Sequence, residues 1–194
     1  MRLIEVRITE EGLGIPTGVV PSSVVGIRKG DLLFLHPLET LYLVLEGEAK
    51  VLIDDEEIKD FKEALSRIIE IVKTWCIKER KGCYLANAFW SMFTTYYKLR
   101  RKGRKVLPEG RREGTLIEIR KNKWWAEYLV LEEGIKISIA QLLEWVEEVR
   151  ANDLKAIIAV VDRNGSVTFY EASRVTLRAP DKRSEGGRVA STAP

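Results

Sequence analysis

The strongest chemical feature of the sequence is a basic run between residues 98 and 112. Eight of these fifteen residues are Lys or Arg, and only Glu109 is acidic. The eight are Lys98, Arg100, Arg101, Lys102, Arg104, Lys105, Arg111 and Arg112. Clustered cations neutralise phosphates and supply sequence-independent affinity for nucleic acid. Cations also suit the C-terminal end of a helix, so RNA binding and a solvated helix end are both open for this run.

A second cluster combines cations with two adjacent tryptophans, in the order Arg120, Lys121, Lys123, Trp124 and Trp125. Neighbouring side chains on a strand point to opposite faces of the sheet. One indole is therefore expected in the core. The other either stacks on a base or fills space in a subunit interface.

Metal-binding and thiol chemistry is sparse. Cys76 and Cys83 are the only cysteines, and His36, the only histidine, is forty positions from Cys76. A structural zinc site needs four ligands, so we predict no metal and no cofactor. A small buried free thiol is the commoner state of a cysteine, so we favour it over a disulfide for Cys76 and Cys83. The sequence does not show whether the two are bonded. His36 precedes Pro37 and is expected to play a structural part at a helix start.

The elements expected over residues 1–80 form a small mixed α/β domain. Short β-branched runs at 3–8, 19–27 and 32–35 predict antiparallel strands, and a further short strand is expected at 50–53. Helical spacing of apolar residues predicts one helix from Pro37 to Gly47 and a long amphipathic helix over 58–75.

The remaining elements form a second domain, expected over 81–178. An aromatic stripe at helical spacing, Phe89, Phe93, Tyr96 and Tyr97, is typical of a core-facing helix. Strands are expected next at 115–120 and 127–131. A helix capped by Ser138 follows, with the apolar face Ile139, Leu142, Leu143, Val146 and Val149. After it we expect a buried strand at 156–161, a hairpin turn at Asn164-Gly165, a returning strand and another strand at 173–177. Residues 179–194 are small and polar and are expected to be a disordered tail. The predicted fold class is α+β with a mixed sheet.

This order of elements resembles the archaeal tRNA-splicing (tRNA-intron) endonucleases over most of residues 32–178. The blocks that carry the resemblance are LFLHPLETLYLVLEGEAKV, YYKLRRKGRKV, AEYLVL, ISIAQLLEWVEEVR and KAIIAVVDRNGSVTFYEASRV. The resemblance implies that the second domain is like the catalytic domain of that family. Members cleave precursor tRNA at bulge-helix-bulge motifs without metal, leaving a 2′,3′-cyclic phosphate and a 5′-hydroxyl.

The family's catalytic Tyr, His and Lys are only partly present. Lys155 matches the Lys, Trp125 stands at the position of the His, and Ile119 is the closest match to the Tyr. Indole and alkyl groups do not exchange protons near neutral pH, so acid-base catalysis is expected to be lost. Tyr128 and Tyr170 are conceivable bases without an acid partner.

The resemblance therefore implies the non-catalytic structural subunit of a heterotetrameric enzyme, partnered by a catalytic subunit and precursor tRNA. It also implies a strand over 167–177 that pairs with the partner, and a hairpin loop at 162–166 that enters a neighbouring subunit. The interface residues expected on this basis are Asp162, Asn164, Val167, Phe169, Tyr170 and Val175.

Two alternatives remain open, a stand-alone RNA-binding protein and an endoribonuclease with unconventional catalytic residues. The formal charge of +3, from 32 Lys and Arg against 29 Asp and Glu, does not decide among them. Four asparagines and one glutamine beside 61 charged residues favour a thermophilic source. Without a signal peptide or an apolar run of membrane-spanning length, we expect a cytoplasmic protein with no membrane partner.

Overall fold

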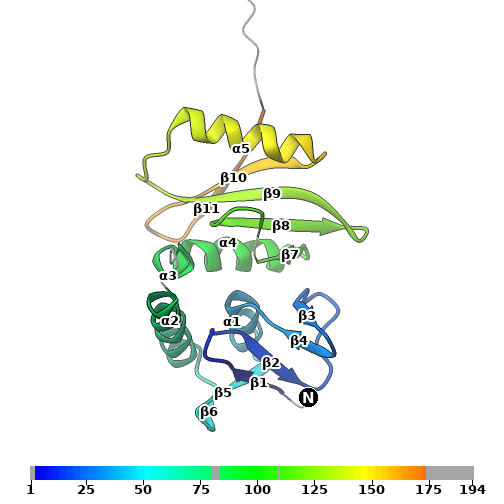
Figure 1. Cartoon of the computed structure of the whole chain (residues 1–194), viewed down its shortest axis with the longest axis vertical. Helices are drawn as coiled ribbons and strands as arrows, with labels where there is room; N and C mark the ends of the chain where they lie inside the picture. The colour runs from blue at the N-terminus through cyan, green and yellow to red at the C-terminus, as the bar shows by residue number, and fades with distance from the viewer. Residues whose placement is uncertain (1–2, 80–83, 109, 174–194) are drawn as a thin grey trace, which may run out of the picture.

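The computed structural model describes residues 3–79, 84–108 and 110–173 (Figure 1). A four-stranded sheet forms the first half of the chain. Its strands are β1 (Ile4–Ile8), β2 (Gly14–Thr17), β5 (Ala49–Ile53) and β6 (Glu56–Ile58), in the order β2-β1-β5-β6. β1 is antiparallel to β2 and parallel to β5, so the sheet is mixed. β3 (Ile27–Lys29) and β4 (Leu32–Phe34) form a separate hairpin.

Two helices pack on the first sheet, and local side-chain bonds fix where each begins. α1 (Pro37–Leu45) starts with a capping box, in which His36 Nδ1 accepts a hydrogen bond from the Leu38 amide at 3.2 Å. The Glu39 carboxylate accepts one in return from the His36 amide at 3.1 Å. α2 (Phe61–Lys78) is capped by Asp60, whose carboxylate accepts from the Glu63 amide. These caps satisfy amides that a helix cannot satisfy itself.

A five-stranded mixed sheet forms the second half. Its strands are β7 (Lys105–Leu107), β8 (Thr115–Arg120), β9 (Lys123–Glu132), β10 (Lys155–Val161) and β11 (Val167–Ala172), in the order β11-β10-β9-β8-β7. β9 and β10 are parallel and are joined through α5 (Ile139–Ala151), while the other pairs are antiparallel. α5 covers one face of this sheet, and the short α3 (Tyr84–Asn87) and α4 (Phe89–Arg101) lie on the other side (Figure 1).

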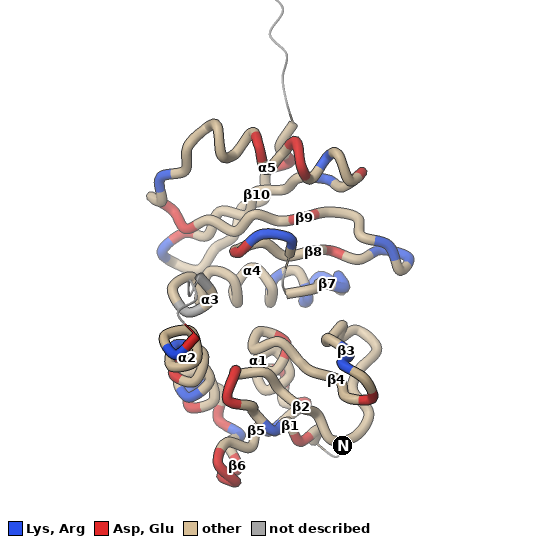
Figure 2. Tube along the Cα trace, in the orientation of Figure 1, with Lys and Arg blue, Asp and Glu red and all other residues tan. Residues whose placement is uncertain are grey.

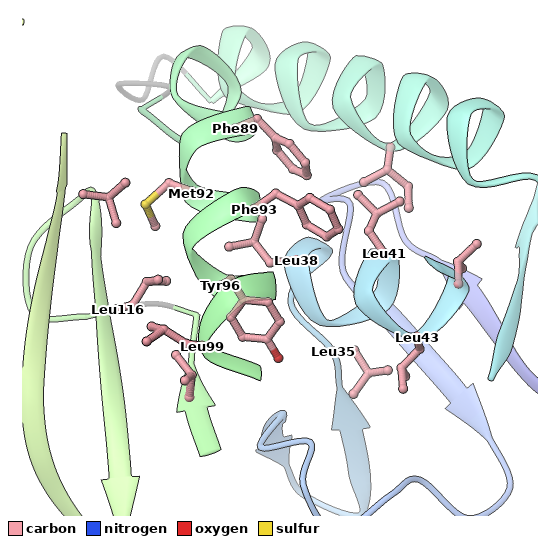
Figure 3. Close-up of a cluster of buried hydrophobic side chains, with 14 of the residues drawn as sticks. Leu35, Leu38, Leu41, Leu43, Phe89, Met92, Phe93, Tyr96, Leu99 and Leu116 are labelled. Atoms are coloured by element: carbon pink, nitrogen blue, oxygen red, sulfur yellow. The ribbon is translucent and has the colours of Figure 1, made fainter. Parts of the chain in front are cut away.

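α4 joins the two halves through one hydrophobic core. Figure 3 shows Phe93 and Tyr96 turned toward α1, and Met92 and Leu99 on the side of the second sheet. The Phe93 ring stacks on Phe61 at 5.5 Å between centroids, and the Tyr96 ring meets Tyr42 edge-on at 6.0 Å. The expectation that the aromatic stripe is core is therefore confirmed.

The predicted α+β class with a mixed sheet is confirmed, but one predicted strand is wrong. Residues 19–26 form no regular strand, because the segment carries Pro21 and ends at Gly26, which adopts φ 57°. Val24 instead packs into the core. The strands β2, β6 and β7 were not predicted. β2 contains Pro16 and lies at the edge of its sheet, where proline is tolerated.

The buried face of α5 also differs from the prediction. Trp145, Val146 and Val149 pack on the sheet, whereas Ile139 is 76% exposed and Leu143 is also exposed. The predicted face omits Trp145, whose buried indole packs between α5 and the sheet. Among the described helices, none is both long and apolar enough to cross a membrane.

Several predictions fall on parts of the chain that are not described. Cys76 is buried but disulfide-bonded, so the expectation of a free thiol is wrong for this residue. Cys83, the only other cysteine in the sequence, lies outside the described residues. The same holds for Val175, for the predicted strand beyond Ser173, and for the tail over 179–194.

Candidate functional site

The structure brings Lys155 close to Trp125, two of the three positions singled out in the sequence analysis. Lys155 opens β10 and lies in parallel register with Ala126 of β9. Its Nζ is 5.3 Å from the centre of the Trp125 ring. The guanidinium carbon of Arg120 lies 3.2 Å from the same ring centre. Trp125 is thus held by two cations, an arrangement that stabilises the indole in place.

A β-bulge sets the position of Trp125. Glu118 is in register with Ala126, but the next residue, Ile119, is in register with Trp124, so Trp125 is the extra residue of β9. A bulge of this kind redirects a side chain relative to the regular alternation. Trp125 is half-buried against the main core, whereas Ile119 lies beside Lys105 and Trp124. Ile119 is therefore not in register with the other two positions.

A buried carboxylate anchors this end of the sheet. Glu118 accepts hydrogen bonds from Arg104 Nη1 at 2.7 Å, from Arg120 Nε at 2.6 Å and from the Tyr128 hydroxyl. Burial raises the pKa of the Glu118 carboxyl, but the hydrogen bonds from Tyr128, Arg120 and Arg104 outweigh it and leave this pKa below its ordinary value. Glu118 is thus an ionised anchor for two arginines.

Tyr128 has no capacity to act as a base in this setting. Burial, reinforced by the bond to Glu118, raises the pKa of the Tyr128 hydroxyl. The phenol therefore stays protonated near neutral pH and serves as a donor. Tyr170, the other conceivable base, is 54% exposed on β11. Lys155 is also engaged, because its Nζ forms an ion pair with Glu171 at 3.1 Å.

The eight cations of the basic run do not form one free patch. Arg100 is buried and donates to the Ser23 carbonyl at 2.7 Å and to the Tyr96 hydroxyl at 3.1 Å. Arg101 pairs with Glu46, Arg104 with Glu118, Arg112 with Glu144 and Glu148, and Lys98 donates to the Val167 carbonyl. Lys102, Lys105 and Arg111 form neither a side-chain hydrogen bond nor an ion pair with any described residue.

Other basic side chains join the basic run at one end of the molecule. Figure 2 shows Lys and Arg gathered at the turn between β8 and β9 and at the end of α4 near β7, on the same side of the view. Lys102 lies 5.5 Å from the Phe169 ring of β11. This end also carries Trp125 and Lys155. Cations and partly exposed aromatic rings thus lie close together at this end.

His36 has a structural role at the start of a helix. Its imidazole caps α1, and burial lowers the pKa of His36 to about 3. It therefore stays neutral, which agrees with the sequence prediction. Within the described residues, no group of three or more His, Cys, Asp and Glu side chains is placed to hold a metal ion.

The predicted interface residues lie on the last strand and the turn before it. β11 is an edge strand of its sheet. Val167 is buried, Phe169 packs edge-on against Tyr128 at 5.8 Å, and Tyr170 faces away from the core. Asp162 Oδ1 accepts from the amides of Asn164 and Ser166, both at 2.8 Å, so this carboxylate shapes the turn.

The sequence analysis missed the Glu118 anchor with its partners Arg104 and Tyr128. The available signal was a charged residue in the middle of an apolar strand, Thr115 to Ile119, at a position that alternation assigns to the interior. A buried Glu of this type needs cationic partners, and the nearby basic run offers them.

Comparison with protein families places one segment of the chain. Residues 89–169 match the family model of the tRNA intron endonuclease, catalytic C-terminal domain. No curated protein matches the chain. The matched segment begins with α4, ends in β11 and includes both Trp125 and Lys155. From α4 to β11, the chain is thus similar to the catalytic C-terminal domain of tRNA intron endonucleases.

Proposed function

We propose that this chain is the non-catalytic, structural subunit of a heterotetrameric tRNA-splicing endonuclease. The observation that carries the proposal is that Trp125, the residue we align with the family's catalytic His, lies beside the cations Arg120 and Lys155. An indole N–H is a donor that does not titrate, so it supplies no proton to a leaving 5′-oxygen.

The remaining groups at this end do not replace the missing functions. The Tyr128 hydroxyl is held protonated against Glu118. Lys155 is tied to Trp125 and Glu171, although it still offers a positive charge. Loss of each proton-transfer group costs about 10²- to 10⁴-fold in rate, so loss of both leaves cleavage by this chain alone at background.

The same proposal assigns a role to β11 and its turn. β11 would pair at its open edge with a catalytic subunit, with Tyr170 as an exposed apolar contact. Asp162 and Asn164 would shape the turn that meets a neighbouring subunit. The substrate is precursor tRNA with bulge-helix-bulge junctions, and the reaction of the complex needs no metal. A thermophilic archaeal source and a cytoplasmic location belong to this proposal.

The test is reconstitution with a catalytic member of the family from the same cell. The purified chain, the catalytic chain and their mixture are incubated with a bulge-helix-bulge RNA in the presence of EDTA. We expect no cleavage by this chain alone, cleavage by the mixture, and a complex on size exclusion. Cleavage by this chain alone would contradict the proposal, as would a mixture that neither associates nor gains activity.

A pair of variants checks the docking edge. Tyr170→Lys places a charge on the exposed side chain of β11 and is expected to prevent complex formation. Ile139→Lys is the matched control, because it changes an exposed apolar residue on α5, away from that edge. The proposal predicts that this control assembles normally.

A further inference from the structure

The hairpin between β8 and β9 projects a short basic tip beside an exposed indole. Arg120 and Lys123 form the last pair of the ladder, so the turn consists of Lys121 and Asn122. Both adopt left-handed backbone angles, φ 48° and φ 60°. Two such residues are what a tight type I′ hairpin requires.

Trp124 follows the turn and is the more exposed of the two neighbouring indoles, with 48% of its surface accessible. It lies in register with Ile119, whereas Trp125 packs against the core. The guanidinium carbon of Arg111 lies 5.4 Å from the centre of the Trp124 ring. The Trp124 ring and the Arg111 guanidinium thus lie side by side on the surface.

The charge around this indole is unbalanced. Lys121, Lys123 and Arg111 are exposed, and none forms an ion pair with a described residue. The carboxylate of the same hairpin, Glu118, is buried and already bonded to Arg104, Arg120 and Tyr128. The net positive charge at the tip is therefore available to an anionic partner.

We infer that the tip of the β8–β9 hairpin, defined by Arg111, Lys121, Lys123 and Trp124, binds an unpaired segment of RNA, with a base stacked on Trp124 and phosphates on the three cations. This inference rests on the proposed function and names a surface that contacts the RNA. Base stacking on an aromatic side chain, next to cations that follow the backbone, is the usual way to hold single strands. Bases inside a duplex are not accessible to such a platform.

The composition of the tip favours RNA over a protein partner. Protein interfaces are enriched in Trp and Arg but depleted of Lys, and two of the three cations here are lysines. Lys121 is also held at a positive φ, which glycine or asparagine adopts more easily. Strain of this kind is typical of functional sites, and here it places a charge at the outermost point of the turn.

The hairpin is also rigid at its base. Arg120 is bonded to Glu118 and stacked on Trp125, and Glu118 is fixed from two further sides. A platform whose supporting residues are locked loses little conformational entropy when a ligand binds. The Glu118 anchor thus acts as a positioning element for Trp124.

The test measures binding of the full chain, without any catalytic subunit, to a fluorescein-labelled oligoadenylate and to a fully paired RNA hairpin of equal charge. Trp124→Ala is expected to weaken oligoadenylate binding by roughly 5- to 150-fold, the range for loss of one stacked base. Trp124→Phe should lose much less. Binding of the paired hairpin should depend little on Trp124.

Lys121→Gly tests the contribution of the charge to RNA binding separately from any effect on folding stability. It removes one cation and relieves the left-handed strain, so we expect weaker oligoadenylate binding without a lower melting temperature. The slope of log affinity against log salt should decrease by about 0.7 in magnitude for each phosphate that is no longer neutralised. The matched controls are Lys136→Gly, an exposed loop lysine beyond the far end of β9, and Trp90→Ala, an exposed indole at the start of α4; neither should change affinity.

Each result decides one way. Oligoadenylate affinity that is unchanged in Trp124→Ala overturns the inference and leaves the proposed function standing. An unchanged affinity together with loss of the complex with the catalytic chain would make the tip a protein contact, which also overturns it. If Trp124→Ala weakens RNA binding while the reconstituted mixture never cleaves, the inference holds and the proposed function fails.

Discussion

The ammonium nitrogen of Lys155 lies 5.3 Å from the centre of the Trp125 ring. Lys155 belongs to β10 and Trp125 to β9, and these are the only parallel pair among the described strands of the second sheet. The guanidinium of Arg120 lies over the same ring. Under the proposed function, Trp125 stands where a catalytic member of the family has its proton donor, and two cations lie close to it. This has a direct consequence for attempts to restore catalysis.

We predict that Trp125→His combined with Ile119→Tyr does not produce a nuclease. Two nearby cations would disfavour protonation of the introduced imidazole, which lowers its pKa and removes it as an acid. The introduced phenol would lie in register with Trp124, past the bulge, and not with position 125. The measurement is cleavage of a bulge-helix-bulge RNA by the purified double variant. Robust cleavage would show that only the two side chains had been lost.

A second prediction concerns Arg100, which belongs to the basic run but is buried. Arg100→Met should lower the free energy of unfolding by about 2–4 kcal/mol, because the Ser23 carbonyl and the Tyr96 hydroxyl lose their partner. Its neighbour Arg101 forms an exposed pair with Glu46, and Arg101→Ala should cost only about 0–1 kcal/mol. Urea titration of both variants checks this. Equal costs would contradict the assignment of Arg100 as a structural clamp.

The contrast between Arg100 and Arg101 also explains what a sequence can and cannot predict. Periodicity placed Phe93 and Tyr96 in the core correctly, because helical spacing is a local property. The sequence also predicted one buried and one accessible tryptophan, and Trp125 is half-buried whereas Trp124 is exposed. Which cation is buried depends on partners 77 residues away, as for Arg100 and Ser23, and no local pattern encodes that distance.

Two further features depended on tertiary structure. The bulge at Trp125 arises from the pairing of β8 with β9, so alignment alone could not reveal that Ile119 and Trp125 are out of register. Arg112 forms ion pairs with Glu144 and Glu148 of α5. These pairs separate Arg112 from the other cations of the basic run, although the run is continuous in the sequence. The candidate site could thus be located from Lys155 and Trp125, whereas its anchoring by Glu118 could not.

A third prediction uses the lowered pKa of Glu118. A carboxyl with a lower pKa in the folded protein stabilises it above the ordinary pKa of about 4.5, and this contribution is lost as the pH falls through the folded value. Glu118→Gln should therefore be less stable than the wild type at pH 7, by roughly 2 kcal/mol. The difference should shrink below pH 4.5. Denaturant titrations at several pH values measure it, and a difference that grows in acid would refute the anchor.

The last prediction concerns His36, whose buried imidazole has a pKa of about 3. The unfolded chain binds a proton on this residue below about pH 6.5, whereas the folded chain does not. Stability should therefore fall as the pH drops from about 6.5 toward 3, by at most about 1.4 kcal/mol for each pH unit. The loss has a structural cause, because a protonated Nδ1 no longer accepts the Leu38 amide at the start of α1.

His36→Asn isolates this effect, because Asn also caps helices but does not titrate and the chain has no other histidine. We expect the variant to lose the dependence between pH 6.5 and 5, where few carboxyl groups titrate. The measurement is the free energy of unfolding across that range for both proteins. If the wild type and the variant have the same slope, the imidazole must be charged in the folded state. In that case it does not cap α1 as a neutral acceptor, and the helix start must be stabilised by Glu39 alone.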